Sequence, residues 1–173
     1  MKHLITLGSL WVMLHKPDCY VLLRRHLGNI NQDFSKACTV TAGSASNITL
    51  GPVNTTATNT SASNTISINC SKTTPYFIGL APSAANGGTT TGSGAMSSVA
   101  NAATNTDKVP YQLNRTSATG PVWGNTATDT APGNGVAATG TGLVQTFTVY
   151  ATAPSANFTP DDYADTVTVN VNY

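Results

Sequence analysis

Apolar and polar residues alternate along most of the chain from Cys38 to Tyr173, and no stretch of this region has the period of a helix. A period of two residues is typical of strands that bury one face and expose the other. Clusters of Gly, Asn, Ser and Pro separate the alternating stretches and indicate turns. The sequence therefore predicts an all-β domain, with strands at residues 37–41, 47–53, 65–71, 75–81, 109–114, 122–124, 144–151 and 164–173.

Two of these predicted strands have the most regular alternation. In the strand at 144–151, Phe147 and Val149 lie on one side, which we expect to face the core. In the C-terminal strand, one side carries Val167, Val169, Val171 and Tyr173. The last nine residues would extend roughly 30 Å as one strand, with no turn after it. We expect this strand to lie beside a groove that another segment fills.

Two long segments, residues 82–108 and 125–143, are rich in Gly, Thr, Asn and Ala. Such low-complexity composition is typical of flexible loops. We expect both segments to be loops at the ends of the β-domain, and no distinctive residue in them indicates a ligand.

Charge is scarce and unevenly distributed along the 173-residue chain, of which charged residues make up 9%. Residues 1–37 contain five Lys or Arg and all three His, whereas residues 38–173 contain three basic residues and five Asp, a net charge of −2. A nucleic-acid-binding domain needs a clustered basic face. The composition therefore argues against nucleic acid as a partner, and the many Thr and Val residues suit a sheet protein with a nearly uncharged surface.

The first 36 residues differ from the rest and are expected to form a leader, with the domain spanning residues 37–173. An apolar run at residues 4–14 follows Lys2 and looks like the core of a secretory signal. No small-x-small cleavage site follows promptly, and the run is too short for a stable membrane span, which takes about 20 residues. The segment is therefore either an inefficient signal or not the natural leader of this domain, and no role is assigned to Cys19.

Cys38 and Cys70 both lie beside strand-like sequence in the β-rich region. A bridge between them would close a loop of about 33 residues and stabilise the fold by roughly 3.5–4 kcal/mol in the chain-entropy model. Such a bridge persists only in an oxidising compartment. The alternative is a pair of buried free thiols, which the spacing by itself leaves open.

Residues 38–173 contain neither His nor Glu, so their many hydroxyl groups lack the usual base of a catalytic site. We therefore predict that the protein is not an enzyme and has no cofactor. Asp161, Asp162 and Asp165 either coordinate a cation or form the polar turn before the last strand; their spacing favours the turn, so no metal is predicted. Trp123 is either a sugar-binding platform or an anchor in the core or at its rim, and the anchor is favoured.

Nine short segments, taken in order together with the two cysteines, carry a family resemblance. They are residues 37–40, 65–70, 74–76, 79–80, 111–113, 122–124, 147–150, 153–154 and 163–173. The region that contains them resembles the spore coat protein U domain family, whose fold is shared with subunits of archaic chaperone-usher pili. Each fragment is a weak signal by itself, and their order makes the resemblance specific.

The resemblance implies an antiparallel, immunoglobulin-like β-sandwich that lacks its final strand, with one disulfide between Cys38 and Cys70. A strand from a partner then completes the sheet by β-augmentation. The partners implied are a periplasmic chaperone, an outer-membrane usher and identical or related pilus subunits. The residues expected to line the acceptor groove and to contact the chaperone are Phe147, Val149, Val167, Val169, Val171 and Tyr173.

By the same resemblance, the protein is expected to be secreted, to pass through the periplasm during assembly, and to reach the cell surface as a structural subunit of a fimbria. There it would support adhesion and biofilm formation. One alternative is a spore or cell coat protein of the same fold, and another is a monomeric adhesin module that binds a carbohydrate or a surface. Residues 24–36 do not hold the alternation of a donor strand, and the run at 4–14 is a minority candidate for that role.

Overall fold

The computed structural model describes residues 11–14, 21–24 and 32–173. By its contacts, the chain divides into two compact units, Met1–Ser35 and Lys36–Tyr173. The second unit carries both larger β-sheets and the hydrophobic core. In the part of the chain that the structure describes, no helix has the length and apolar character needed to cross a membrane.

The described part of the first unit is a short pair of strands. β1 (Trp11–Leu14) runs antiparallel to β2 (Val21–Arg24), and Trp11 lies opposite Arg24. Most of the apolar run at 4–14 and Cys19 lie outside the described residues. The leader and its candidate donor segment therefore stay predictions.

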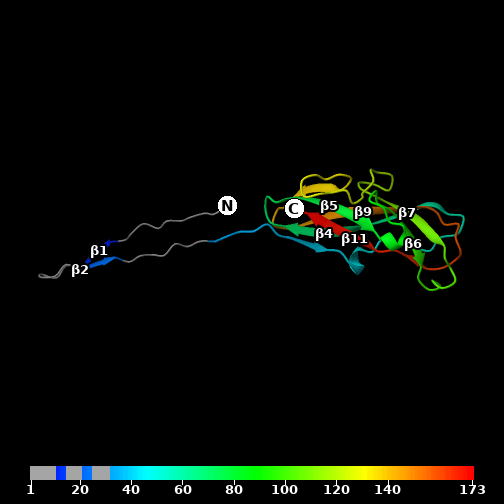
Figure 1. Ribbon diagram of the computed structural model, residues 1–173, viewed down its shortest axis with the longest axis horizontal. Helices are drawn as coiled ribbons and strands as arrows, with labels where there is room; N and C mark the ends of the chain where they lie inside the picture. Colours follow the sequence, from blue (N-terminus) through cyan, green and yellow to red (C-terminus); the bar gives the residue numbers. More distant parts are fainter. Residues whose placement is uncertain (1–10, 15–20, 25–31) are drawn as a thin grey trace. The chain divides into compact units, whose positions relative to one another are not determined.

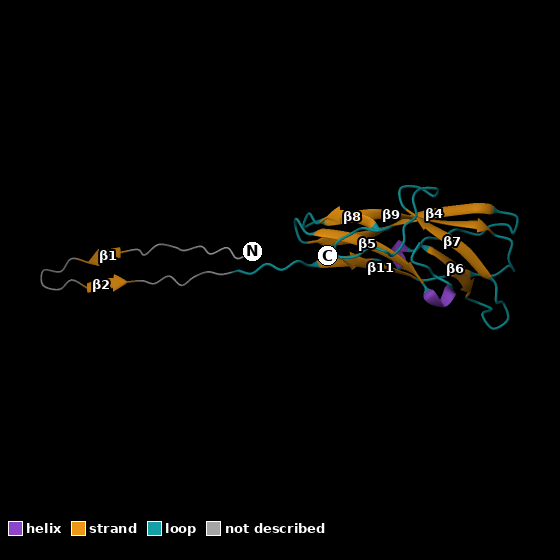
Figure 2. Ribbon diagram, turned by 45° about the horizontal axis from the view of Figure 1, so that its top comes forward, coloured by secondary structure: helices purple, strands orange, loops and turns teal. Residues whose placement is uncertain are grey.

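Two antiparallel sheets form the second unit (Figure 2). The larger sheet has the strand order β10-β6-β7-β9-β4-β3, and the smaller sheet has the order β11-β5-β8. The elements are β3 (Cys38–Thr41), η1 (Ser44–Ser46), β4 (Thr58–Cys70), β5 (Pro75–Pro82), η2 (Ala84–Asn86), β6 (Ser93–Ser98), β7 (Lys108–Asn114), β8 (Val136–Thr139), β9 (Val144–Ser155), β10 (Tyr163–Ala164) and β11 (Val167–Asn172). The all-β, antiparallel, immunoglobulin-like sandwich predicted from the sequence is thus confirmed.

The core contains alternate residues of strands from both sheets. On β5 these are Tyr76, Ile78 and Leu80, and β4 contributes Ile66 and Ile68, all of them buried. The residues between them along β4 are more exposed, so the alternation in the sequence corresponds to the two faces of the strand. Each buried aliphatic side chain contributes roughly 1.5–3 kcal/mol to the stability of the fold.

Trp123 belongs to this core and is 1% exposed. Its indole Nε1 donates a hydrogen bond to the backbone oxygen of Ile78 at 3.0 Å, which satisfies the polar atom of the buried ring. Trp123 is therefore a core anchor, and the interpretation as a sugar platform is wrong. The segment 122–124 forms only an isolated bridge between Val122 and Asn114, not the short strand predicted there.

Strand boundaries differ from the predicted ones where the sequence is mostly polar. β4 begins at Thr58, because its polar first half pairs with the second half of β9 and not because it has an apolar side of its own. The predicted strand at 47–53 does not form. Instead, the side-chain Nδ2 of Asn64 donates a hydrogen bond to the backbone oxygen of Asn47 at 2.7 Å, and Ile48 packs against the core from an irregular segment.

Both predicted end loops contain secondary structure, so the prediction of two flexible loops is wrong. Residues 82–108 include η2 and β6, and residues 125–143 include β8. β6 is built largely from small residues, and a Cβ atom on its Gly94 would lie only 2.6 Å from the hydroxyl oxygen of Tyr111. The small residues of β6 permit close packing. Composition alone does not show whether small residues permit close packing or make a segment flexible.

The C-terminal strand is divided between the two sheets. β10 pairs with β6 in the larger sheet, whereas β11 pairs with β5 in the smaller one. The chain leaves one sheet and joins the other at Asp165 and Thr166, in the red part of the ribbon (Figure 1). The prediction of one continuous nine-residue strand is therefore wrong, although its second part keeps the predicted alternation.

Candidate functional site

Four strands of the second unit, β3, β8, β10 and β11, have a side that pairs with no other strand in the described part of the chain, and two of these edges lie close together. β3 is the last strand of the larger sheet, and β11 is the last strand of the smaller sheet. They lie near each other without pairing, β3 in light blue and β11 in red (Figure 1). We call these two edges, Cys38–Thr41 and Val167–Asn172, the β3–β11 seam. Their outward N–H and C=O groups are available to a further strand.

The β11 side of the seam presents a row of three valines, Val167, Val169 and Val171. Val169 lies opposite Leu80 and Val171 opposite Ile78 in the neighbouring strand β5. Since directly paired residues point to the same face of a sheet, the valines share the face of buried Leu80 and Ile78. They pack against the core but are only half-buried, because no strand among the described residues covers their outer side. The row is thus an apolar surface within reach of a strand added at this edge.

The β3 side of the seam contributes Val40, which the sequence analysis did not select. Val40 lies opposite Ile68 and on the same face, yet it is 40% exposed whereas Ile68 is 0% exposed. The difference follows from the position of β3 at the edge of the sheet. The feature of the sequence that could have identified Val40 is the alternation of Cys38 and Val40 within the predicted first strand.

A disulfide ties β3 to the rest of the larger sheet. Cys38 and Cys70 lie directly opposite each other in the β3–β4 pair and are bonded, with a sequence separation of 32 residues. The predicted pairing is confirmed, and the alternative of two free thiols is wrong. Because β3 is short and, among the strands that the structure describes, has a neighbour on one side only, this bond holds one wall of the seam in place.

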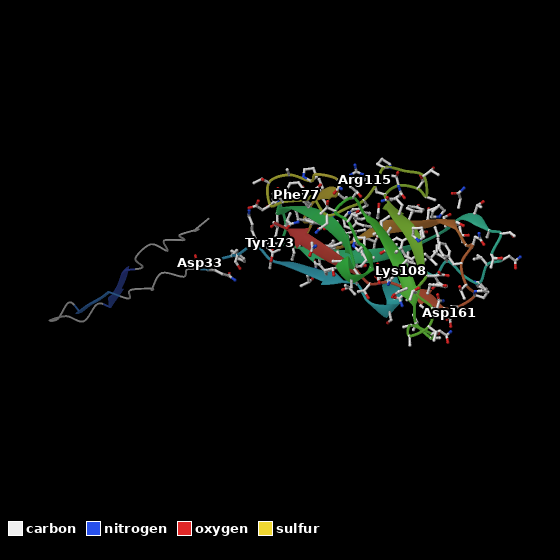
Figure 3. All side chains as sticks on the ribbon, turned by 45° about the vertical axis from the view of Figure 1, so that its right-hand side comes forward. Asp33, Phe77, Lys108, Arg115, Asp161 and Tyr173 are labelled. Atoms are coloured by element: carbon white, nitrogen blue, oxygen red, sulfur yellow. A yellow bond between two sulfur atoms is a disulfide. The ribbon has the colours of Figure 1, made fainter. Side chains whose placement is uncertain are left out.

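The remaining residues that were expected to line the acceptor groove lie in other positions. Phe147 and Val149 are on β9, an interior strand of the larger sheet, where Val149 is buried and Phe147 is half-buried. The ring of Phe147 packs edge-on against Tyr76, with ring centroids 6.3 Å apart. Tyr173 follows the end of β11 and is 47% exposed (Figure 3). The structure therefore brings the three valines to the seam edge and puts Phe147 and Val149 on the interior strand.

The other face of β11 is held by a connecting loop. The side-chain amide of Asn170 donates to Oδ1 of Asn125 at 2.9 Å, and that of Asn172 donates to the backbone oxygen of Ala127 at 3.4 Å. Gly79 on β5 permits this approach, since a Cβ atom there would lie 2.3 Å from Oδ1 of Asn125. β11 is thus fixed on one face by the loop, packed on the core with the other, and unpaired along one edge.

The acidic residues before β11 take part in two separate hydrogen-bond networks. The carboxylate of Asp161 accepts bonds from Ser98, Asn101 and Asn105 at 2.6, 3.0 and 2.9 Å, whereas Asp165 is bonded to other partners. Among residues 11–14, 21–24 and 32–173, no group of three or more His, Cys, Asp or Glu side chains is arranged to hold a metal ion. Asp161 therefore organises the turn before β10 by joining it to the segment after β6.

Stability is expected to decrease in strong acid through Asp161. Hydrogen bonds from Ser98 and then Asn105 favour the charged carboxylate and lower the pKa of Asp161 from 3.8 to about 2. Because the pKa in the folded state lies below that of the unfolded chain, the contribution is complete above pH about 4 and is lost as the pH falls toward about 2. The measurement is the difference in unfolding midpoint between the wild type and Asp161→Asn as a function of pH.

We expect this difference to shrink through that acidic window. The exposed neighbour Asp162, changed to Asn, is the control for the loss of one negative charge. A difference between the wild type and Asp161→Asn that stays constant from neutral pH to pH about 2 would contradict the assignment.

Comparison with known proteins gives one family and one solved structure of note. The model of the Spore Coat Protein U domain matches residues 27–170. A chain in the crystal structure of the CsuC-CsuE chaperone-tip adhesion subunit pre-assembly complex, from archaic chaperone-usher Csu pili of Acinetobacter baumannii, superimposes with a TM-score of 0.54 at 19% sequence identity. The match covers 92% of this chain and 48% of that one, so this chain spans about half its length. At this identity the likeness shows the fold alone, and no curated protein matches the sequence.

Proposed function

Because the chain belongs to the Spore Coat Protein U domain family, we propose that it is a structural subunit of an extracellular chaperone-usher fibre whose sheet is completed by a strand from another chain. The observation that carries the proposal is the β3–β11 seam. It combines two strand edges that are unpaired among the described residues with a row of three half-buried valines on β11 that pack against the core. In a fully closed sandwich, a neighbouring strand would cover such a row of valines.

An added strand would interact with the seam in two ways. Its main-chain N–H and C=O groups would pair with the free edges of β3 and β11, and its alternate side chains would cover Val40 and the three valines of β11. Each apolar side chain buried in this way contributes roughly 1.5–3 kcal/mol before the entropy of association is subtracted. The seam therefore favours a partner with strict apolar–polar alternation.

The partners and the location follow from this mode of assembly. The solved structure with a similar fold is a chaperone-tip adhesion subunit pre-assembly complex, which supports a periplasmic chaperone as the first partner. We further propose an outer-membrane usher and identical or related subunits as later partners. The protein would then lie in the periplasm during assembly and on the cell surface afterwards, supporting adhesion and biofilm formation. The absence of His and Glu from residues 38–173 supports a structural role over a catalytic one.

We also propose which residues form the domain and which form the leader. The second compact unit begins at Lys36, and the family match begins at residue 27. We propose that residues 37–173 form the subunit body and that residues 1–36 form the leader. The family's name favours one second candidate, a coat protein that uses the same seam to assemble. A dependence of secretion on a neighbouring chaperone gene distinguishes the fibre from the coat.

Val169→Asp is expected to weaken strand binding by at least about tenfold, because an unpaired carboxylate would be buried beneath the added strand. The probe is a labelled synthetic peptide in which Val and Thr alternate, titrated with the full chain and followed by fluorescence anisotropy. Amide hydrogen exchange gives the location, since protection should appear in β3 and β11. The matched control is Thr168→Asp, which puts the same charge on the exposed face of the same strand.

The proposal fails if Val169→Asp binds the alternating peptide as tightly as the wild type does. It also fails if a peptide of the same composition with its valines in one block binds equally well. Thr168→Asp should keep nearly the wild-type affinity, which separates an effect at the seam from an effect of net charge.

A further inference from the structure

Asp165 occupies the point where the chain changes sheets, directly between β10 and β11. Its carboxylate is bonded to two elements that are distant in sequence. Oδ2 accepts a hydrogen bond from the hydroxyl of Tyr111 on β7 at 2.6 Å, and Oδ1 accepts one from Nδ2 of Asn86 in η2 at 2.8 Å. The side-chain oxygen of Asn86 in turn accepts a bond from Nζ of Lys108 at 2.7 Å. We call these four residues the Asp165 clamp; of its members, Figure 3 labels Lys108.

The tyrosine of the clamp is well placed to hold Asp165 in one position. Tyr111 is 6% exposed, and its burial, together with the hydrogen bond to Asp165, raises the pKa of its hydroxyl, which therefore stays a donor. The close approach of Gly94 leaves no room for a Cβ atom beside the ring. A short bond from a neutral hydroxyl to a carboxylate is among the stronger hydrogen bonds in proteins. Asp165 is thus anchored to the larger sheet just before the chain enters the smaller one.

The anchor matters because β11 is a short edge strand, and Asp165 adds a determinant of register to the packing of the valines and to the bonds of Asn170 and Asn172 with the connecting loop. β11 is six residues long and, within the described part of the chain, pairs with β5 alone. A slip of one residue along β5 would turn all of its side chains to the opposite face. The valine row would then point outward, and Thr168 and Asn170 would point into the seam. Asp165 lies two residues before Val167, so fixing its position fixes which residues of β11 face the core.

We propose that the Asp165 clamp sets the register of β11 and thereby positions Val167, Val169 and Val171 to receive the added strand. Asp165 is in this sense a positioning residue for the strand addition on which the proposed function rests. Its two contacts reach β7 and η2, so the wall of the seam is aligned from the larger sheet and not only by its ladder with β5.

The test compares Asp165→Ala and Tyr111→Phe with the matched control Asp162→Ala in the full chain. Loss of a hydrogen bond to a charged group should weaken binding of the alternating Val/Thr peptide roughly tenfold in both clamp variants. Amide exchange should become faster in β11 but not in β8, which pairs with the other side of the same strand β5. Asp165→Asn, which keeps an oxygen for the tyrosine hydroxyl, should restore part of the affinity, and Asp162→Ala should behave as the wild type.

Two results would overturn the inference. One is faster exchange in β8 and β11 alike, which indicates general destabilisation; the other is unchanged exchange of β11 in both clamp variants. Failure of the proposed function gives a different pattern. In that case the wild type itself does not bind the alternating peptide, while the selective exchange of β11 in Asp165→Ala still reports the effect of the clamp on this strand.

Discussion

Replacing Trp123 with Ala is expected to lower the free energy of unfolding by about 3–5 kcal/mol, the range for removing a large aromatic side chain from a core. The indole is 1% exposed and packs in the core cluster that both sheets share. Its removal leaves a cavity and also leaves the backbone oxygen of Ile78 without the donor at 3.0 Å. Chemical denaturation of the wild type and the variant, followed by circular dichroism, measures the difference.

Trp123→Phe separates the two parts of this effect. The phenyl ring keeps much of the apolar volume but has no N–H group, so we expect an intermediate loss, of which the lost hydrogen bond to the Ile78 oxygen accounts for about 0.5–1.5 kcal/mol. If Trp123→Ala costs less than about 1 kcal/mol, the side chain is not the anchor that the structure shows. Because Trp123 lies away from both strands of the seam in sequence and pairing, the folded fraction of Trp123→Phe should still bind the alternating peptide.

Removal of the disulfide has the second large expected effect. The double change Cys38→Ala and Cys70→Ala should lower the free energy of unfolding by roughly 3.5–4 kcal/mol in the chain-entropy model, given the separation of 32 residues. The loss has a local consequence as well. β3 has four residues and one neighbour among the described strands, so without the bond it should detach and remove one wall of the seam.

Two measurements check this result. The first uses a Cys19→Ser background, which prevents disulfide exchange with the third cysteine. In this background, with Cys38 and Cys70 intact, adding reductant should lower the free energy of unfolding by the same amount as the double change to Ala. Amide exchange should become faster in β3 than in β9, which lies on the other side of β4. An unchanged unfolding midpoint after reduction, with the bond shown to be broken, would contradict the structural role of the Cys38–Cys70 bond.

Much of the fold could be predicted because alternation is a local property. Val167, Val169 and Val171 share one face of β11, as their spacing indicates, because successive side chains of any extended strand point to opposite sides. The same reasoning identified β5, β7 and β9 to within a few residues at their starts. The bond between Cys38 and Cys70 was implied by the family resemblance, since their spacing left free thiols open, and the structure puts the two residues opposite each other in the β3–β4 pair.

The parts that could not be predicted depend on pairing between distant segments. β6 is made largely of small residues and has no clear apolar face in its sequence; it forms because β7 and β10 lie on either side of it. The polar first half of β4 is a strand because β9 pairs with it. Val40 was missed as a seam residue, since its exposure comes from the edge position of β3 and not from its neighbours in the chain.

The sequence by itself determined that this protein is built from strands with one apolar side, because alternation acts between residues only two positions apart. Only the tertiary structure decided which edges are left unpaired and where the last strand divides. The bond between Tyr111 and Asp165 joins residues 54 positions apart, and no local pattern records such a contact. The chain changes sheets at Asp165 because partners on β7 and η2 hold it there, and the valine row of β11 comes to lie at a free edge as a result.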